Sequence, residues 1–289
     1  MQPDRMNIQW YPGHMTKTRR QIEADLKQVD AVCEIVDARI PVSSRNPNID
    51  AICGNKPRII VLNRMDLADP GATKRWLSFF RSKGMAAVAT DCKTRKGIAD
   101  FQPAVHSVLK EKIERNAAKG MNRPVRVMVV GIPNVGKSTL INQISGRKGA
   151  KAENRPGVTR GKQWVTVDNG LLLLDTPGIL WPKFDDPEVG MMLAYTGAVK
   201  ENVIDTEELA CRLMELLWRL YPDTVRERYK VDLPKDAPGY MLLEEAGRKR
   251  GFLLARSEIN TERMAKVLLD EYRSGKLGYF TLEEPEDVL

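Results

Sequence analysis

The sequence predicts an α/β protein with a mostly parallel sheet, followed by a small domain made of helices alone. Short apolar runs rich in β-branched residues alternate with helical patterns up to about residue 200, and only helical spacing continues beyond it. Strands that alternate with helices are typical of βαβ units, in which helices cover both faces of a parallel sheet. We therefore expect two domains, at residues 1–185 and 186–289.

Five apolar runs predict buried strands. The run Ile-Ile-Val-Leu-Asn at residues 59–63 is the clearest, because continuous apolarity is typical of a strand buried on both faces. The other four runs are residues 31–36, 85–89, 125–130 and 171–174. The helical patterns around them are residues 16–28, 72–83, 98–118, 137–144 and 187–199.

The C-terminal third predicts three helices. In the first, leucines recur at offsets of 4, 7, 8 and 11 from Leu209 and line one helix face, and Asp205 with Glu208 resembles a capping box. Two further helices are expected at 240–249 and 261–273, the last one capped by Asn260 and ended by Gly275. We expect the final acidic residues, 283–287, to be a solvated tail.

Composition limits the function classes. Lysine and arginine total 46 against 38 acidic residues, and the resulting net charge of +8 favours a polyanionic partner such as RNA. The four cysteines lack the spacing of a zinc site or a disulfide framework, so we expect free thiols. No apolar run approaches the ~18 residues that span a bilayer, and no signal segment begins the chain. We expect a cytoplasmic monomer that does not contact a membrane.

One segment predicts a phosphate-binding loop. Gly131-Ile132-Pro133-Asn134-Val135-Gly136-Lys137-Ser138 matches G-x-x-x-x-G-K-[ST] between a predicted strand and a predicted helix. Its glycines let backbone N–H groups point at phosphate oxygens, Lys137 neutralises the β- and γ-phosphates, and the Ser138 hydroxyl ligates Mg²⁺. We expect the residues from Asn134 to Thr139 to bind nucleotide. A glycine-rich turn without a ligand is the alternative.

Two later segments complete the predicted phosphate side. Asp175 ends a buried strand and begins Asp-Thr-Pro-Gly, so it can hold Mg²⁺ through water while the Gly178 N–H senses a γ-phosphate. Between the loop and this strand, Thr159 lies in a polar segment and can complete the Mg²⁺ shell. Alone, each of these signals is weak, and an ordinary mobile loop is the alternative for the Thr159 segment.

The base is expected to contact Asn63-Arg64-Met65-Asp66, at the end of the 59–63 strand. A carboxylate accepts from both the N1–H and the exocyclic amine of guanine, a donor pair that adenine lacks, so Asp66 selects GTP over ATP. Thr90, Asp91 and Cys92, after the next strand, are a candidate base-side loop. A helix cap is the alternative for the four-residue motif.

The order of these motifs resembles a circularly permuted Ras-like P-loop GTPase. The base motif comes first and Asn63 precedes Gly131 by 68 residues, the reverse of the Ras-like order. More closely, the chain resembles the ribosome biogenesis GTPase A (YlqF) family, through Trp10-Tyr11-Pro12-Gly13-His14-Met15, through Asp37-Ala38-Arg39-Ile40-Pro41 and through a helical C-terminal domain. The resemblance implies GTP hydrolysis coupled to late maturation of the large (50S) ribosomal subunit.

The resemblance also implies catalytic residues and cofactors. Ile179 stands where Ras-like enzymes have a water-orienting glutamine, and its side chain cannot hydrogen-bond a nucleophile. The family pattern gives this role to His14, with Lys137 and Thr159 as the other catalytic residues; an exposed or RNA-contacting His14 is the alternative. Mg²⁺ is the expected cofactor, and the family suggests K⁺ with Asn134 as a ligand. Arg64 replaces the lysine of N-K-x-D, which can shift guanine affinity.

The expected partners are GTP, GDP and the large ribosomal subunit with its rRNA. Residues 147–162 hold six basic side chains and one acid, and Arg248-Lys249-Arg250 lies in the helical domain, which the resemblance implies is RNA-binding. A solvated charged face is the alternative for either cluster. A nucleotide-gated RNA-binding module with incidental hydrolysis is one alternative. Another is a permuted GTPase that acts on a different RNA.

Overall fold

The computed structural model describes residues 22–121, 123–146, 163–167, 170–178, 186–199, 205–254 and 257–288. Within them the chain forms two compact units, which we call the sheet unit (residues 22–178 and 283–288) and the helical unit (residues 186–282). The sequence predicts a solvated tail at residues 283–287. That prediction is wrong for Glu283, whose carboxylate accepts the backbone N–H groups of Val42 and Ser43, and for Pro285, which is buried, whereas Glu286 is exposed.

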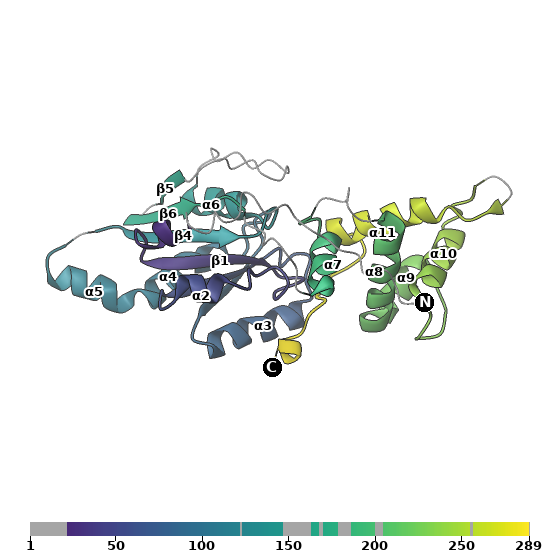
Figure 1. Ribbon diagram of the computed structural model, residues 1–289, viewed down its shortest axis with the longest axis horizontal. Coiled ribbons are helices and arrows are strands. Elements are labelled where there is room, and N and C mark those ends of the chain that lie inside the picture. Colours follow the sequence, from purple (N-terminus) through teal and green to yellow (C-terminus); the bar gives the residue numbers. More distant parts are fainter. Residues whose placement is uncertain are drawn as a thin grey trace. The chain divides into compact units, whose positions relative to one another are not determined.

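The sheet unit is built on a six-stranded sheet in the order β3-β2-β1-β4-β6-β5 (Figure 1). All neighbours are parallel except β5 and β6, which are antiparallel. The strands are β1 (Ala31–Asp37), β2 (Arg58–Asn63), β3 (Ala86–Thr90), β4 (Val125–Gly131), β5 (Gln163–Val167) and β6 (Leu171–Asp175). The predicted mostly parallel α/β fold is therefore confirmed. Strand β5 was missed because it is an edge strand in which only Val165 and Val167 are buried.

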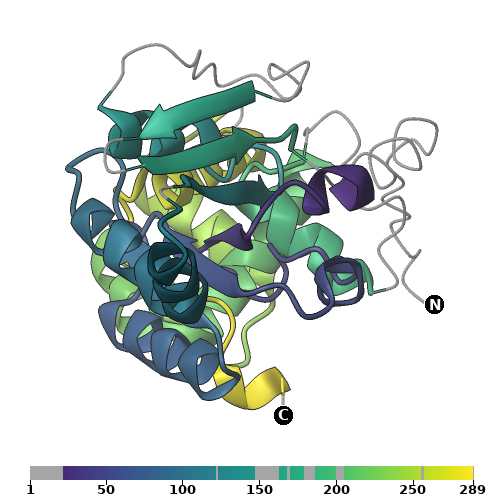
Figure 2. The ribbon, with the colours of Figure 1, turned by 90° about the vertical axis from the view of Figure 1, so that its left-hand side faces the viewer.

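Helices cover both faces of this sheet (Figures 1 and 2). The sheet unit contains α2 (Ile49–Cys53), α3 (Pro70–Ser82), α4 (Phe101–Val108), α5 (Lys110–Ala118) and α6 (Lys137–Ser145), with a 3₁₀ turn, η1 (Ile98–Asp100). Asp69 caps α3 by accepting the Ala72 N–H, and α3 buries Trp76 and Phe80. The single helix predicted at 98–118 is divided, because Leu109 leaves helical geometry with φ −109° and ψ 9°.

The helical unit contains α7 (Pro187–Tyr195), α8 (Thr206–Leu220), α9 (Pro222–Tyr229), α10 (Gly239–Lys249) and α11 (Thr261–Ser274). Helix α8 packs against α10 and α11 through the predicted stripe, in which Leu209, Leu213 and Leu217 are buried. Its N-cap Asp205 accepts the N–H groups of Glu207 and Glu208. The predicted cap of α11 is also confirmed, since Asn260 accepts the Arg263 N–H.

The chain then enters a final 3₁₀ turn, η5 (Pro285–Val288), in the sheet unit. Across the described ranges, no helix is both long and apolar enough to span a membrane.

Candidate nucleotide-binding site

The predicted site residues lie at one edge of the sheet, because parallel strands all present their carboxyl ends to the same edge. Strands β1, β2 and β3 end side by side, with Asp37 paired to Asn63 and Asn63 paired to Thr90. On the other side of β1, strand β4 ends at Gly131, where the phosphate-binding loop begins, and β6 ends at Asp175. The permuted motif order therefore does not separate the motifs in space.

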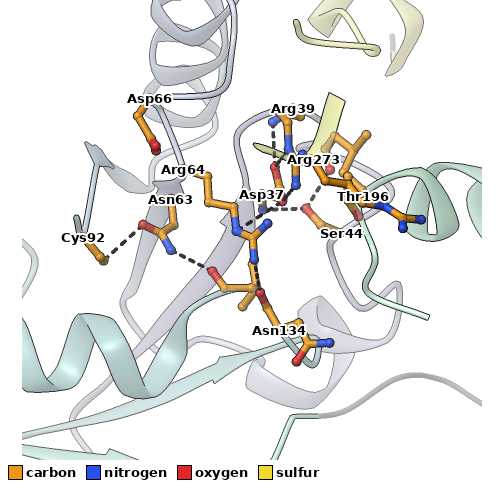
Figure 3. Close-up of polar contacts among 12 residues, drawn as sticks. Asp37, Arg39, Ser44, Asn63, Arg64, Asp66, Cys92, Asn134, Thr196 and Arg273 are labelled. Carbon is orange, nitrogen blue, oxygen red and sulfur yellow. Dashed lines mark hydrogen bonds and ion pairs between the residues drawn. The ribbon is translucent and has the colours of Figure 1, made fainter. Parts of the chain in front are cut away.

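Asn63 links the base motif to the phosphate-binding loop (Figure 3). Its side-chain Nδ2 donates to the Val135 carbonyl at 2.7 Å, and its Oδ1 accepts from Thr90 Oγ1 at 3.0 Å and Cys92 Sγ at 3.2 Å. Burial raises the pKa of the Cys92 thiol to about 11, so the thiol keeps the hydrogen that it donates. These bonds hold the buried Asn63 amide in one orientation between the phosphate-binding loop and the base-side loop.

Gly136 explains why the loop needs glycine next to Asn63. Its φ is +101°, and a Cβ at this position would lie 2.3 Å from Asn63 Nδ2. A side chain would therefore both strain the backbone and displace the amide. Gly136 immediately precedes α6, so the helix N-terminus lies at the loop and adds positive potential for phosphate.

Arg64 makes a second link between the two motifs. Its guanidinium donates to the Asn134 carbonyl at 2.6 Å and lies 3.9 Å from the Asp37 carboxylate (Figure 3). Arginine can hold both partners at once because its donors are arranged as a planar fork. The arginine that stands here in place of the motif's lysine therefore contacts both the phosphate-binding loop and the end of β1.

The carboxylate of Asp66 is half-buried and makes one ion pair, at 3.5 Å, with the largely exposed Lys93. Its remaining acceptor capacity suits a base with two adjacent donors. Asp91 behaves differently: its carboxylate accepts from the N–H groups of Lys93 and Thr94 and from the Thr94 hydroxyl, so it shapes its own loop. Of the predicted base-side residues, Thr90 and Cys92 support Asn63 and Asp91 builds the turn.

The phosphate side brings Lys137, Ser138 and Asp175 together. Lys137 Nζ donates to the carbonyls of Gly131 at 3.0 Å and Ile132 at 2.8 Å. Burial lowers the pKa of Lys137 to about 8, against the opposing charge of Asp175. Burial likewise raises the pKa of Asp175, partly offset by Lys137 and by hydrogen bonds from Ser138 and Thr176. Burial thus disfavours the charged form of both side chains, and each charge is stabilised by the other or by a bound ligand.

The Asp-Thr-Pro-Gly segment packs directly on the phosphate-binding loop. A Cβ on Gly178 would lie 2.8 Å from Pro133 Cα and 2.9 Å from Lys137 Nζ, so only glycine fits there. Thr176 anchors the segment by donating to the Val129 carbonyl at 2.7 Å. The backbone after β6 is therefore placed beside the lysine that is expected to meet a terminal phosphate.

The residues present fit Mg²⁺. Ser138 Oγ donates to Asp175 Oδ2 at 3.2 Å, and Asp175 Oδ1 is buried with no hydrogen-bond partner within the described ranges. A hydroxyl beside an uncompensated carboxylate oxygen is the hard donor set that Mg²⁺ takes alongside nucleotide phosphates. Bound there, the ion would supply charge neutralisation to the phosphate oxygens. Thr139, half-buried, follows Ser138 on the first turn of α6.

Three predicted residues or segments lie outside the described residues: His14, Thr159 and the basic run 147–162. Their roles in orienting water, completing the metal shell and binding RNA stay predictions. The same is true of K⁺ at Asn134, whose backbone adopts φ +60° in the loop.

Asp37 and Arg39 were not predicted as site residues, but the structure places them beside Arg64. Asp37 accepts the Arg39 N–H and two guanidinium nitrogens at 2.8–3.0 Å, and both side chains are buried. Burial alone would raise the pKa of Asp37, but the charge and hydrogen bonds of Arg39, with the charge of Arg64, hold it below its usual value. The available signal was an aspartate ending a buried strand next to the base-motif strand.

Known proteins share this architecture and sequence. A family model described as 50S ribosome-binding GTPase matches residues 126–219. Ribosome biogenesis GTPase A of Priestia megaterium is 46% identical over 98% of this chain and 99% of its own length, and that of Thermotoga maritima is 32% identical over 97% and 96%. GNP-bound YlqF from T. maritima superposes with a TM-score of 0.64 at 28% identity, covering 93% of this chain and 99% of that one. A GDP-bound YlqF structure gives 0.67 at 29% identity, covering 93% and 100%. The chain belongs to the ribosome biogenesis GTPase A (YlqF) family of GTP-hydrolysing enzymes.

Proposed function

We propose that this GTPase acts as a switch in late assembly of the large (50S) ribosomal subunit and that the subunit stimulates its GTP hydrolysis. The observation that carries the proposal is the hydrogen bonding of Asn63 and Arg64 to the phosphate-binding loop, because it holds the base motif and the phosphate motif side by side, as binding of one nucleotide by both requires. The names of the relatives and of the family model supply the ribosomal context. We infer that the protein works as a cytoplasmic monomer.

Each residue has a specific part in the proposed reaction. Asp66 accepts the guanine donors, and Asn63 and Arg64 hold the base motif against the loop. Lys137 exchanges the carbonyls of Gly131 and Ile132 for phosphate oxygens. Ser138 and Asp175 would hold Mg²⁺, with Thr159 joining them in the triphosphate state. His14 orients the attacking water. Asn134 would hold K⁺, which would supply positive charge beside the phosphates.

The basic cluster of the helical unit, which we propose contacts RNA, forms ion pairs with acids of the same unit. Arg248, Lys249 and Arg250 each lie within 4 Å of a glutamate of the same unit: Arg248 of Glu244 and Glu245, Lys249 of Glu245, and Arg250 of Glu271. The pairs of Arg248 and Lys249 are exposed and contribute little energy, so a phosphate backbone can replace their acids, whereas the partner of Arg250, Glu271, is buried. We infer that this cluster contributes to RNA binding together with residues 147–162.

The proposal is tested by the rate of single-turnover GTP hydrolysis, measured without ribosomal subunits, with purified large subunits and with small subunits at the same concentration. We expect large but not small subunits to raise the rate, and His14→Ala to remove that increase without removing GTP binding. A rate unchanged by either subunit would favour a nucleotide-gated RNA-binding module. Stimulation by small subunits alone would favour a permuted GTPase acting on a different RNA.

A further inference from the structure

Glu283 and Glu284, near the end of the described chain, bind the rest of the sheet unit through several hydrogen bonds. The Glu283 carboxylate accepts the Val42 N–H through Oε2 at 2.6 Å and the Ser43 N–H through Oε1 at 3.0 Å and Oε2 at 3.2 Å. The main-chain carbonyl of Glu283 accepts the indole N–H of Trp76 at 2.9 Å. The Glu284 carboxylate accepts hydrogen bonds from Arg75 Nε at 2.9 Å and from Arg75 Nη2 at 2.6 Å.

The contacts of this segment reach buried residues of the sheet unit. Trp76 is a core side chain of α3, only 1% exposed, and Pro285 is buried as η5 packs against α3. Because the backbone, the carboxylate and the following proline are all engaged, residues 283–285 are held at fixed register. We call residues 283–285 the C-terminal clasp.

The clasp holds the loop that leads out of β1 toward the base motif. In this loop, residues 38–44, Ser44 Oγ accepts the Asp37 N–H at 2.9 Å and donates to the Ile40 carbonyl at 2.6 Å. The Ala38 N–H donates to the Asn63 carbonyl at 2.9 Å. The loop held by Glu283 therefore touches the strand end that carries the guanine-reading motif.

A continuous set of polar contacts runs from the clasp to the phosphate-binding loop. Glu283 holds Val42 and Ser43, Ser44 holds the Asp37 backbone, and the Asp37 carboxylate faces Arg64. Arg64 in turn donates to Asn134 in the phosphate-binding loop. None of the steps crosses between the two units, since residues 283–288 belong to the sheet unit.

We propose that Glu283 is a positioning residue for nucleotide binding, acting through residues 38–44 on Asp37 and Arg64. The bonds of Glu283 to Val42 and Ser43 hold the chain just after Leu282, and bound nucleotide is expected to strengthen them. Coupling is reciprocal, so a clasp that strengthens nucleotide binding is itself strengthened by nucleotide. The proposal concerns the isolated protein and does not depend on any ribosomal partner.

Three variants of the full chain test the role of the carboxylate. Glu283→Ala removes both acceptors. Glu283→Gln retains one acceptor oxygen, and the geometry of Oε2 shows that one oxygen lies within hydrogen-bond distance of both the Val42 and Ser43 nitrogens. Glu286→Ala is the matched control, because Glu286 lies in the same segment and is exposed.

The expected result is a GDP dissociation constant raised between about twofold and about thirtyfold by Glu283→Ala, the range for residues along a coupling route. Glu283→Gln keeps one acceptor oxygen but turns its amide N–H₂ toward the Ser43 N–H, so it should restore part of the affinity. Glu286→Ala should leave the affinity unchanged. A merely structural role would lower the midpoint of thermal unfolding but leave GDP affinity unchanged at temperatures where the variant is folded. That outcome, or a Glu283→Gln variant as weak as Glu283→Ala, would overturn the proposal.

Hydrogen exchange tests the proposal on the unaltered protein, so its result does not depend on whether a variant folds. Hydrogen exchange is followed for peptides containing Val42 and Ser43 and for the peptide spanning 283–288, with and without GDP. We expect GDP to slow exchange in both, while α5, none of whose residues is buried, stays unchanged. Protection confined to the phosphate-binding loop and the base motif would overturn the proposal.

Discussion

The side-chain amide of Asn63 donates a 2.7 Å hydrogen bond to the main-chain carbonyl of Val135, 72 residues further along the chain. This bond joins the end of β2 to the loop after β4, across the intervening strand β1. Two motifs that are distant and inverted in sequence thus share one hydrogen-bonded framework.

Asn63→Ala should weaken GTP and GDP binding together. The change leaves the Val135 carbonyl and the Thr90 hydroxyl without their partner in a buried setting, at a cost of about 1–3 kcal/mol. Fluorescent-nucleotide titration measures the affinity. Asn116→Ala, on the poorly buried helix α5, is the matched control. Unchanged affinity in Asn63→Ala would show that the link between the motifs is dispensable.

Asp66→Asn should change base preference from guanine to xanthine. Xanthine has a carbonyl where guanine has its exocyclic amine, and the asparagine amide can donate to it. We expect GTP affinity to fall by about 1.5–3 kcal/mol, the cost of losing a hydrogen bond to a charged group. Competition by GTP, XTP and ATP measures the switch. Lys93→Ala, which removes only the exposed partner of Asp66, should leave the preference for GTP in place.

Gly136→Ala should weaken nucleotide binding far more than Gly146→Ala. Both glycines have positive φ, so both variants carry backbone strain. A Cβ at Gly146 meets nothing within 4 Å, whereas one at Gly136 would lie 2.3 Å from Asn63 Nδ2. The additional overpacking is expected to cost about 1–3 kcal/mol of binding free energy. Equal GDP affinities in the two variants would contradict the close approach of the motifs.

Nucleotide affinity should fall as pH rises above 8. Burial holds the pKa of Lys137 at about 8, so the amine is mostly charged below that pH and mostly neutral above it. Phosphate favours the charged amine and raises its pKa, so binding at higher pH must take up a proton. Calorimetry at pH 8.5 in two buffers of different ionisation enthalpy measures the uptake. In Lys137→Arg the side chain stays charged at this pH, so nucleotide binding should take up no proton. Proton uptake that persists in this variant would assign the proton to another group.

Much of the fold and of the site could be predicted from the sequence because local signals agree with one another. Continuous apolar runs marked β1, β2, β4 and β6, and side-chain caps marked α8 and α11. The phosphate-binding loop was predictable because the spacing of Gly131, Gly136 and Lys137 reflects backbone geometry that few other residues allow.

What the sequence could not show depends on long-range pairing. Strand β5 alternates buried and exposed residues over only five positions, and Leu109 interrupts a helical pattern that is continuous in sequence. Asp37 acquires its role from Arg64, 27 residues away, and Glu283 from backbone donors 240 and 241 residues away. An acidic C-terminal run predicts solvation by composition alone, and only the fold brings Val42 and Ser43 to it.

One guanine nucleotide is expected to contact Asp66 with its base and Lys137 with its phosphates. This arrangement is tested by calorimetric titration of the unaltered protein, Asp66→Ala and Lys137→Ala with GDP, GMP and IDP. We predict a single site, a penalty for losing the exocyclic amine (IDP) that disappears in Asp66→Ala, and a penalty for losing the β-phosphate (GMP) that shrinks in Lys137→Ala. Two independent sites, or penalties that stay the same in both variants, would contradict it.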